Sequence, residues 1–169
     1  MDFQELMNKR YSVRAYKTDP LEEEILQQVL DAARMAPTAH NKQPFQLILI
    51  RTAGREEELK RIYNKDWFSQ APVVVLACAV HDSAWSRADG KNYSEVDTTI
   101  AMDHLIMAAT DFGLGTCWVA DFDPQAARKI LKLPEGVEPI AFTPIGYPAV
   151  DPRTKRRKTL TELVRNDNW

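Results

Sequence analysis

The stretch from Val96 to Phe112 constrains the fold more than any other part of this sequence. Its spacing is helical, and its apolar residues cover most of the helix circumference: Ile100, Leu105, Ile106, Met107, Ala108, Ala109 and Phe112. A helix that is apolar nearly all round must be buried, either at the centre of a domain or in an interface between subunits. We therefore expect the rest of the chain to pack around this helix, which Gly113 should end.

The remaining elements intermix strands and helices. Pro72 precedes Val73–Val80, an almost continuous apolar run that predicts a strand covered on both faces. Further strands are expected at Phe45–Ile50, Thr116–Val119 and Ile140–Ile145. Helices are expected after Asp2, from the Asp19-Pro20 pair to Ala33, over Glu56–Tyr63, and from Asp123-Pro124 to Leu131. The order lacks a strict βαβ alternation, which indicates the α+β class, in one domain over residues 1–169.

Composition excludes several classes of protein. The 44% hydrophobic and 27% charged content is typical of a globular enzyme. No stretch approaches the roughly 20 apolar residues of a membrane span, and the first residues do not resemble a signal peptide. Cys78 and Cys117 form no CxxC pair, which favours a reduced, cytoplasmic protein. A net charge of −2 and a pI near 5.9 argue against nucleic acid as a partner.

The sequence contains no recognisable catalytic group of its own. His40, His81 and His104 lack metal-ligand spacing, and there is no GxSxG, GxGxxG or GxxxxGK[ST] motif. Asp103-His104 could form an oriented base, although a hydrogen-bonded helix histidine is the favoured interpretation. We therefore name no catalytic side chain and no metal ligand, and expect an enzyme of this sequence to use a cofactor.

Two basic features are candidates for binding an anion. Arg10 and Arg14 flank Ser12, and guanidinium groups form charge-assisted forks with phosphate oxygens. From spacing alone, a pair of exposed surface arginines is an equal alternative. The run Arg153–Lys158 is more often a solvated arm than a binding site. The polar stretch His81–Tyr93 is expected to be a loop, and it could cover a site.

Four motifs in order resemble the nitroreductase superfamily. They are Arg10–Arg14, Pro37–Pro44, Gly113–Trp118 and Pro144–Pro148, the last followed by a basic tail. Each is weak alone, but together they extend the resemblance from residue 2 to about residue 165. The resemblance implies a central, mainly antiparallel sheet flanked by helices in an intertwined homodimer. It also implies FMN in each of two clefts at the dimer interface.

The resemblance also implies a role for individual residues. Arg10, Tyr11, Ser12 and Arg14 should contact the FMN phosphate, ribityl chain and pyrimidine edge, and Arg157 should close over the phosphate. The other subunit should line the flavin with Pro37, Thr38, Ala39 and Asn41. Trp118, Val119, Ala120 and Asp121 should run beside the isoalloxazine ring, with a backbone N–H near N5, and Asn64 should lie near the ring.

The activity implied by the resemblance has two steps. NADH or NADPH passes a hydride to flavin N5, and a nitroaromatic or quinone then takes two electrons. A specialised flavin enzyme such as a reductive dehalogenase, a flavin-binding sensor or carrier without turnover, and a cofactor-free dimeric domain are the alternatives. Trp67, Phe68, Trp85 and Tyr93 could form an aromatic wall for planar acceptors, although core or interface packing is an equal expectation for Trp67 and Phe68.

Overall fold

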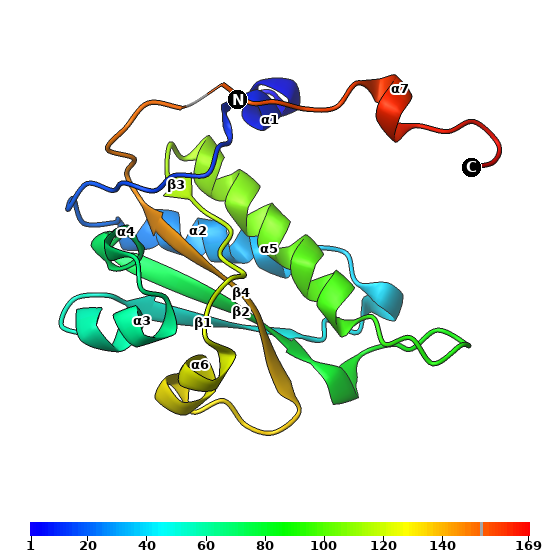
Figure 1. Ribbon diagram of the computed structural model, residues 1–169, viewed down its shortest axis with the longest axis horizontal. Helices are drawn as coiled ribbons and strands as arrows, with labels where there is room; N and C mark the ends of the chain where they lie inside the picture. The colour runs from blue at the N-terminus through cyan, green and yellow to red at the C-terminus, as the bar shows by residue number, and fades with distance from the viewer. Residues whose placement is uncertain (153) are drawn as a thin grey trace.

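A four-stranded antiparallel sheet in the order β1-β2-β4-β3 organises the computed structural model, which describes residues 1–152 and 154–169 (Figure 1). Its strands are β1 (Phe45–Arg51), β2 (Val73–Val80), β3 (Gly115–Thr116) and β4 (Val137–Gly146). The α-helices are α1 (Phe3–Lys9), α2 (Glu23–Arg34), α3 (Glu56–Ile62), α4 (Asp66–Gln70), α5 (Ser94–Asp111), α6 (Pro124–Leu131) and α7 (Leu160–Leu163), with 3-10 turns η1 (Ala39–Asn41) and η2 (His81–Ser83). The predicted α+β class with an antiparallel sheet is confirmed.

Strand β2 is the centre of the core, and its two faces contact different helices. Val73, Val75 and Ala77 pack with apolar residues of α2 and α5. Val74, Leu76 and Cys78 alternate with them and pack with apolar residues of α3, α6 and β4. Because successive side chains of a strand point to opposite faces, a strand covered on both sides reads as a continuous apolar run. The prediction of a doubly covered strand is confirmed.

Helix α5 is buried along the sheet, as its apolar circumference predicted. Ala101, Leu105 and Ala109 have no exposed surface, and α2 packs along α5. Gly113 has φ 73°, and the following amide of Leu114 donates to the Ala109 carbonyl at 2.8 Å. A glycine in this left-handed conformation closes a helix at low steric cost. The predicted end of the helix is correct.

Three element boundaries differ from the sequence-based expectation. Helix α2 begins at Glu23 rather than Pro20: the backbone is still extended at Glu22, which precedes the helix, and Leu21 packs against the core. Strand β4 begins at Val137 rather than Ile140. The expected strand Thr116–Val119 is shorter, since only Gly115–Thr116 forms regular pairs and Val119 makes an isolated bridge to Phe142. Helix α4, a single short turn, was not predicted.

The two helices nearest the chain ends, α1 and α7, contribute no buried residue to the core. Asp2 caps α1 by accepting the Glu5 amide at 2.8 Å, as expected. The apolar side chains of these helices nevertheless face outward: Phe3 is 67% exposed, Leu160 78% and Leu163 62%. Figure 1 shows α7 on a C-terminal segment that passes α1 and then extends away from the sheet. Within the described ranges, no helix combines the length and apolar character of a membrane span.

Candidate functional site

The arginine segment, residues 10–16, is extended and hydrogen-bonds to two other parts of the chain, β3 and the residues after β4. The Val13 amide donates to the Thr116 carbonyl at 2.8 Å, and the Ala149 amide donates to the Ala15 carbonyl at 2.9 Å. Val13 is buried, and its neighbours Ser12 and Arg14 are exposed, because side chains alternate in extended backbone. Ser12 and Arg14 are therefore presented on the side opposite to Val13.

Two glycines make room for this segment against the sheet. Gly115 and Gly146 are paired across β3 and β4. A Cβ on Gly115 would lie 2.7 Å from a methyl carbon of Val13, and a Cβ on Gly146 would lie 2.9 Å from the Pro72 ring and 3.2 Å from Tyr16. These separations are shorter than carbon–carbon contact distances. The close approach of the arginine segment thus depends on two positions without side chains.

Both ends of the chain line one cavity of about 530 Å³. The N-terminal segment contributes Arg10, Tyr11, Ser12, Arg14 and Ala15, and the C-terminal segment contributes Val150, Asp151, Thr154, Lys155, Arg156 and Arg157. The Tyr11 hydroxyl donates to the Val150 carbonyl at 2.6 Å, which ties the segments together. Five of the predicted site residues, Arg10, Tyr11, Ser12, Arg14 and Arg157, therefore meet here. Arg153, part of the predicted basic run, lies outside the described residues.

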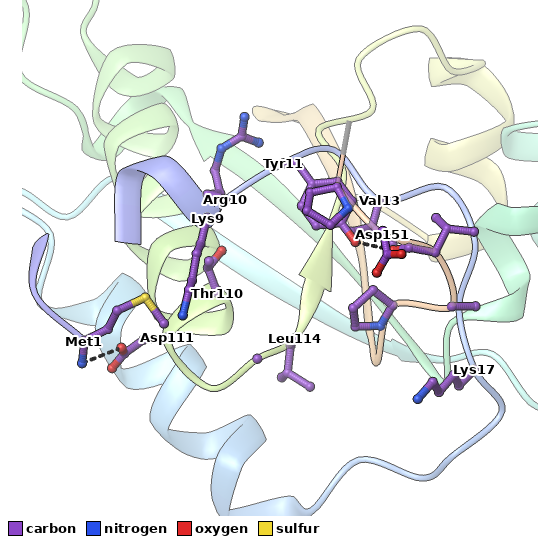
Figure 2. A pocket seen from close by; sticks show the side chains of 15 residues that line it. Met1, Lys9, Arg10, Tyr11, Val13, Lys17, Thr110, Asp111, Leu114 and Asp151 are labelled. Atoms are coloured by element: carbon purple, nitrogen blue, oxygen red, sulfur yellow. Dashed lines mark hydrogen bonds and ion pairs between the residues drawn. The ribbon is translucent and has the colours of Figure 1, made fainter. Parts of the chain in front are cut away.

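A second cavity of about 600 Å³ adjoins the first beneath α1 (Figure 2). Arg10 and Tyr11 line both cavities, as do Val150 and Asp151. Figure 2 shows the Lys9 and Arg10 side chains pointing in opposite directions from the end of α1. Arg10 thus stands at the boundary between the two spaces.

Lys155 is a cavity residue that the motif comparison did not single out. Its ammonium group donates to the carbonyls of Met7 (2.7 Å) and Asn8, at the C-terminal end of α1. Burial lowers its pKa, and the positive charges of Arg10 and Arg157 lower it further. The last carbonyls of a helix lack partners within the helix and often accept from a Lys or Arg side chain. The basic run after β4 could therefore have suggested a residue that caps a helix end. The close cations make this cavity a strongly attractive place for an anion.

Arg14 is oriented by an aromatic group. Its guanidinium carbon lies 5.9 Å from the centre of the Trp67 ring on α4, within cation–π range. Trp67 is half-buried, and Phe68 beside it is 1% exposed and packs in the core. Core packing is therefore the correct alternative for Phe68. Asn64 is exposed in the short connection between α3 and α4.

The segment Trp118–Asp121 is only partly available to a ligand. Trp118 is 37% exposed, and Ala120 and Asp121 are also exposed. Val119 is buried, and its amide donates to the Phe142 carbonyl at 2.9 Å. The Val119 amide is therefore not available as a donor to a ligand.

The loop Pro37–Asn41 does not line the cavity of its own protomer, so the structure does not bring its four predicted residues to the arginines. It follows α2 and contains η1. The Thr38 hydroxyl accepts the Gln43 amide at 3.0 Å, and the Asp97 carboxylate accepts the Ala39 amide at 3.0 Å. The assignment of this loop to the site of a second subunit stays a prediction.

The stretch His81–Tyr93 is more ordered than the expected polar loop. After η2, an isolated bridge between Ser86 and Asn92 forms a short hairpin, which projects from one end of the molecule (Figure 1). Trp85 stacks on His40 with ring centres 5.4 Å apart, and its centre lies 5.1 Å from that of Tyr93. The base of the hairpin thus packs against the loop that contains His40, through the ring of Trp85.

Comparison with known proteins identifies the family. The family model described as Nitroreductase family matches residues 7–65 and 55–147. The chain belongs to the nitroreductase family. A crystal structure of a nitroreductase family protein from Clostridium difficile 630 is 38% identical, with a TM-score of 0.90 and complete coverage of both chains. The fold and the superfamily resemblance are therefore confirmed.

Curated relatives of this nitroreductase-family chain carry oxidoreductase names. An FMN reductase (NAD(P)H) of Bacillus subtilis is 29% identical over 170 residues, covering 90% of this chain and 68% of the relative. An NADH dehydrogenase of Thermus thermophilus is 26% identical over 187 residues, covering 92% and 91%. Family membership places this chain among oxidoreductases.

Proposed function

We propose that this protein is an FMN-dependent NAD(P)H oxidoreductase that reduces nitroaromatic, quinone or similar acceptors. One observation carries the proposal: cationic side chains from both ends of the chain, Arg10, Arg14 and Arg157, converge on a single cavity. The name of the Bacillus subtilis relative supports FMN as the group bound.

The residues of the cavity fit a phosphorylated cofactor. A phosphate monoester carries nearly two negative charges at neutral pH. Arg10 and Arg157 provide planar forks of donors, and Lys155 adds a third positive charge. The Ser12 hydroxyl adds a neutral donor. Asp151 is the carboxylate among the lining residues, and the cations beside it outnumber it.

The flavin ring requires apolar walls and a few dipoles rather than charges. Arg14, held over Trp67, would place positive charge at the pyrimidine edge. Trp118 would offer an aromatic face, and an amide of Trp118, Ala120 or Asp121 would donate near N5. Asn64 would lie at the rim of the ring.

A homodimer would complete each site. Pro37, Thr38, Ala39 and Asn41 would reach the flavin bound by the second copy. The exposed apolar side chains of α1 and α7 support this arrangement, because such groups are normally covered in a stable protein. The free, buried thiols of Cys78 and Cys117 fit the reducing conditions of a cytoplasm.

When bound, FMN supplies hydride and electron transfer between NADH or NADPH and the acceptor, in two steps. The protein's own residues bind and orient. Arg10 and Arg157 would hold the phosphate end, and the positive charge of Arg14 would favour negative charge at the pyrimidine edge. No side chain is proposed to transfer a proton or to act as a nucleophile.

A colour test distinguishes this function from its rivals. Purified protein supplied with FMN should be yellow, should be bleached by NADH or NADPH without oxygen, and should regain its colour when a quinone is added. Yellow protein that neither nucleotide bleaches would support a flavin-binding protein without turnover. Protein that does not retain FMN would support a cofactor-free domain.

A further inference from the structure

Asp97 is a buried carboxylate in the first turn of α5, on the side of the helix that packs in the core. It is 2% exposed, and its Oδ1 accepts the Ala39 amide at 3.0 Å. Its Oδ2 is also buried and has no hydrogen-bond partner among the described residues. Packing alone does not explain an acidic side chain here, because burying a carboxylate with one unpaired oxygen is unfavourable. What the carboxylate provides at this position is an acceptor for the Ala39 amide.

The loop that Asp97 contacts has an unusual backbone. His40, Asn41 and Gln43 have φ angles of 52°, 54° and 50°. Residues with a Cβ seldom adopt positive φ, and such conformations persist only where surrounding contacts determine them. A loop with three such residues among four positions therefore needs external anchors.

Three contacts can provide that anchoring, and they differ in strength. The Thr38 hydroxyl accepts the Gln43 amide within the loop itself, and His40 stacks on Trp85 of the exposed hairpin. Among the described residues, Asp97 alone offers the loop a charged acceptor from the buried core. Hydrogen bonds to charged groups are stronger than those between neutral groups.

We propose that Asp97 is the positioning residue of the flavin-facing loop. It fixes the Ala39 amide and so holds Pro37, Thr38 and Asn41 in the conformation that the flavin ring requires. The inference rests on the proposed function, since it assigns the loop to FMN. Asp97 itself does not touch the cofactor.

The test removes each partner of this hydrogen bond in turn. Asp97→Ala removes the acceptor, whereas Asp97→Asn keeps an acceptor oxygen and removes the charge. Ala39→Pro removes the donor, and proline suits this position because Ala39 is the first residue of a helical turn that follows an extended residue. Glu95→Ala, at an exposed position on the same turn of α5, is the matched control.

Two readouts are measured on folded apoprotein. Hydrogen exchange of peptides covering residues 37–43 should accelerate in Asp97→Ala and Ala39→Pro. FMN titration followed by flavin fluorescence should show a dissociation constant raised about tenfold or more in both. Asp97→Asn should give an effect between those of the wild type and Asp97→Ala, because an acceptor oxygen remains but its charge is lost. The Asp97→Ala/Ala39→Pro double variant should bind no more weakly than either single variant, because both remove the same bond.

The outcomes separate this inference from the proposed function. Normal exchange and normal FMN affinity in Asp97→Ala, or additive losses in the double variant, would overturn the role of Asp97. If Asp97→Ala does not fold, normal affinity in Ala39→Pro overturns it equally. Failure of the wild type itself to bind FMN would instead overturn the proposed function.

Discussion

The cavity at the chain ends and the loop Pro37–Asn41 are built in contrasting ways. The cavity is formed within one protomer, by an extended segment whose amides and carbonyls bond to β3 and to the chain after β4. The loop lies outside that cavity, and positive φ angles shape its backbone. The first region gathers charge, whereas the second offers a particular backbone shape.

This difference suggests how the proposed cofactor is recognised. A phosphate needs converging cations, which a single chain can supply from its two ends. A planar ring needs walls on several sides, and the proposed second copy supplies one of them. Affinity should therefore depend mainly on the first region, and the coupling of affinity to assembly should depend on the second.

The largest expected effect comes from removing the converging cations. Arg10→Ala and Arg157→Ala should each weaken FMN binding by about 1.5–3 kcal/mol, the range for hydrogen bonds to charged groups. The double variant should lose more than either single variant in an FMN titration, although not necessarily the sum, because both arginines are assigned to one phosphate. Lys129→Ala, an exposed lysine on α6, is the control. FMN affinity unchanged in the double variant would remove the phosphate assignment.

A second prediction concerns the proposed assembly. Phe3→Asp and Leu163→Asp place charges on apolar surfaces that are exposed in one protomer, and each should weaken the dimer by about 1.5–3 kcal/mol if that surface is covered in it. Light scattering should show a shift from the mass of two chains to one, with release of FMN on dilution. Glu57→Asp on α3 should change neither. A single chain that retained FMN would contradict a site shared between subunits.

A third prediction tests the support under the arginine segment. Gly115→Ala should lower the free energy of unfolding by about 1–3 kcal/mol, the range for overpacking, because its Cβ would meet Val13. Adding Val13→Ala should recover part of that loss by making space. Denaturant titration of both variants checks this. If Gly115→Ala is as stable as the wild type, the segment has more freedom than the structure shows.

The smallest expected effect concerns the thiols. Burial raises the pKa of Cys78 to about 12 and also raises the pKa of Cys117. A raised pKa leaves little reactive thiolate at pH 8, so both thiols should resist a disulfide reagent in native protein and react on unfolding. The folded state favours the neutral thiols, so their contribution to stability should decline above about pH 8.5, where unfolded cysteine ionises. Rapid labelling of native protein at pH 8 would contradict the burial.

The sequence predicted the fold best where the chain is buried. Val73–Val80 is an almost continuous apolar run and the helix that Gly113 follows is apolar nearly all round, as expected of a strand covered on both faces and of a buried helix. Helix α4 has too few residues to show a period, and α2 starts only after Leu21 has packed against the core, a contact with distant parts of the chain. Tertiary contacts set these boundaries.

The candidate site was predictable only in part, because some of its features also depend on tertiary contacts. The motifs located Arg10, Ser12 and Arg157, but motif spacing says nothing about the contact of Lys155 with the end of α1 or the stacking of Arg14 on Trp67. Nor does it show that Val119 faces the core with its amide already bonded. Such facts depend on backbone direction and on neighbours that are far apart along the chain.

The bond between Lys155 and Met7 joins residues 148 positions apart. Chains are synthesised from the N-terminus, and early segments begin to fold before later ones emerge. The sheet and α5 can therefore form before the C-terminal wall of the cavity is in place. Binding of a phosphorylated ligand at this cavity must follow the docking of the C-terminal segment on α1. A protein cut short after Pro152 should retain its core yet remain permanently without that wall.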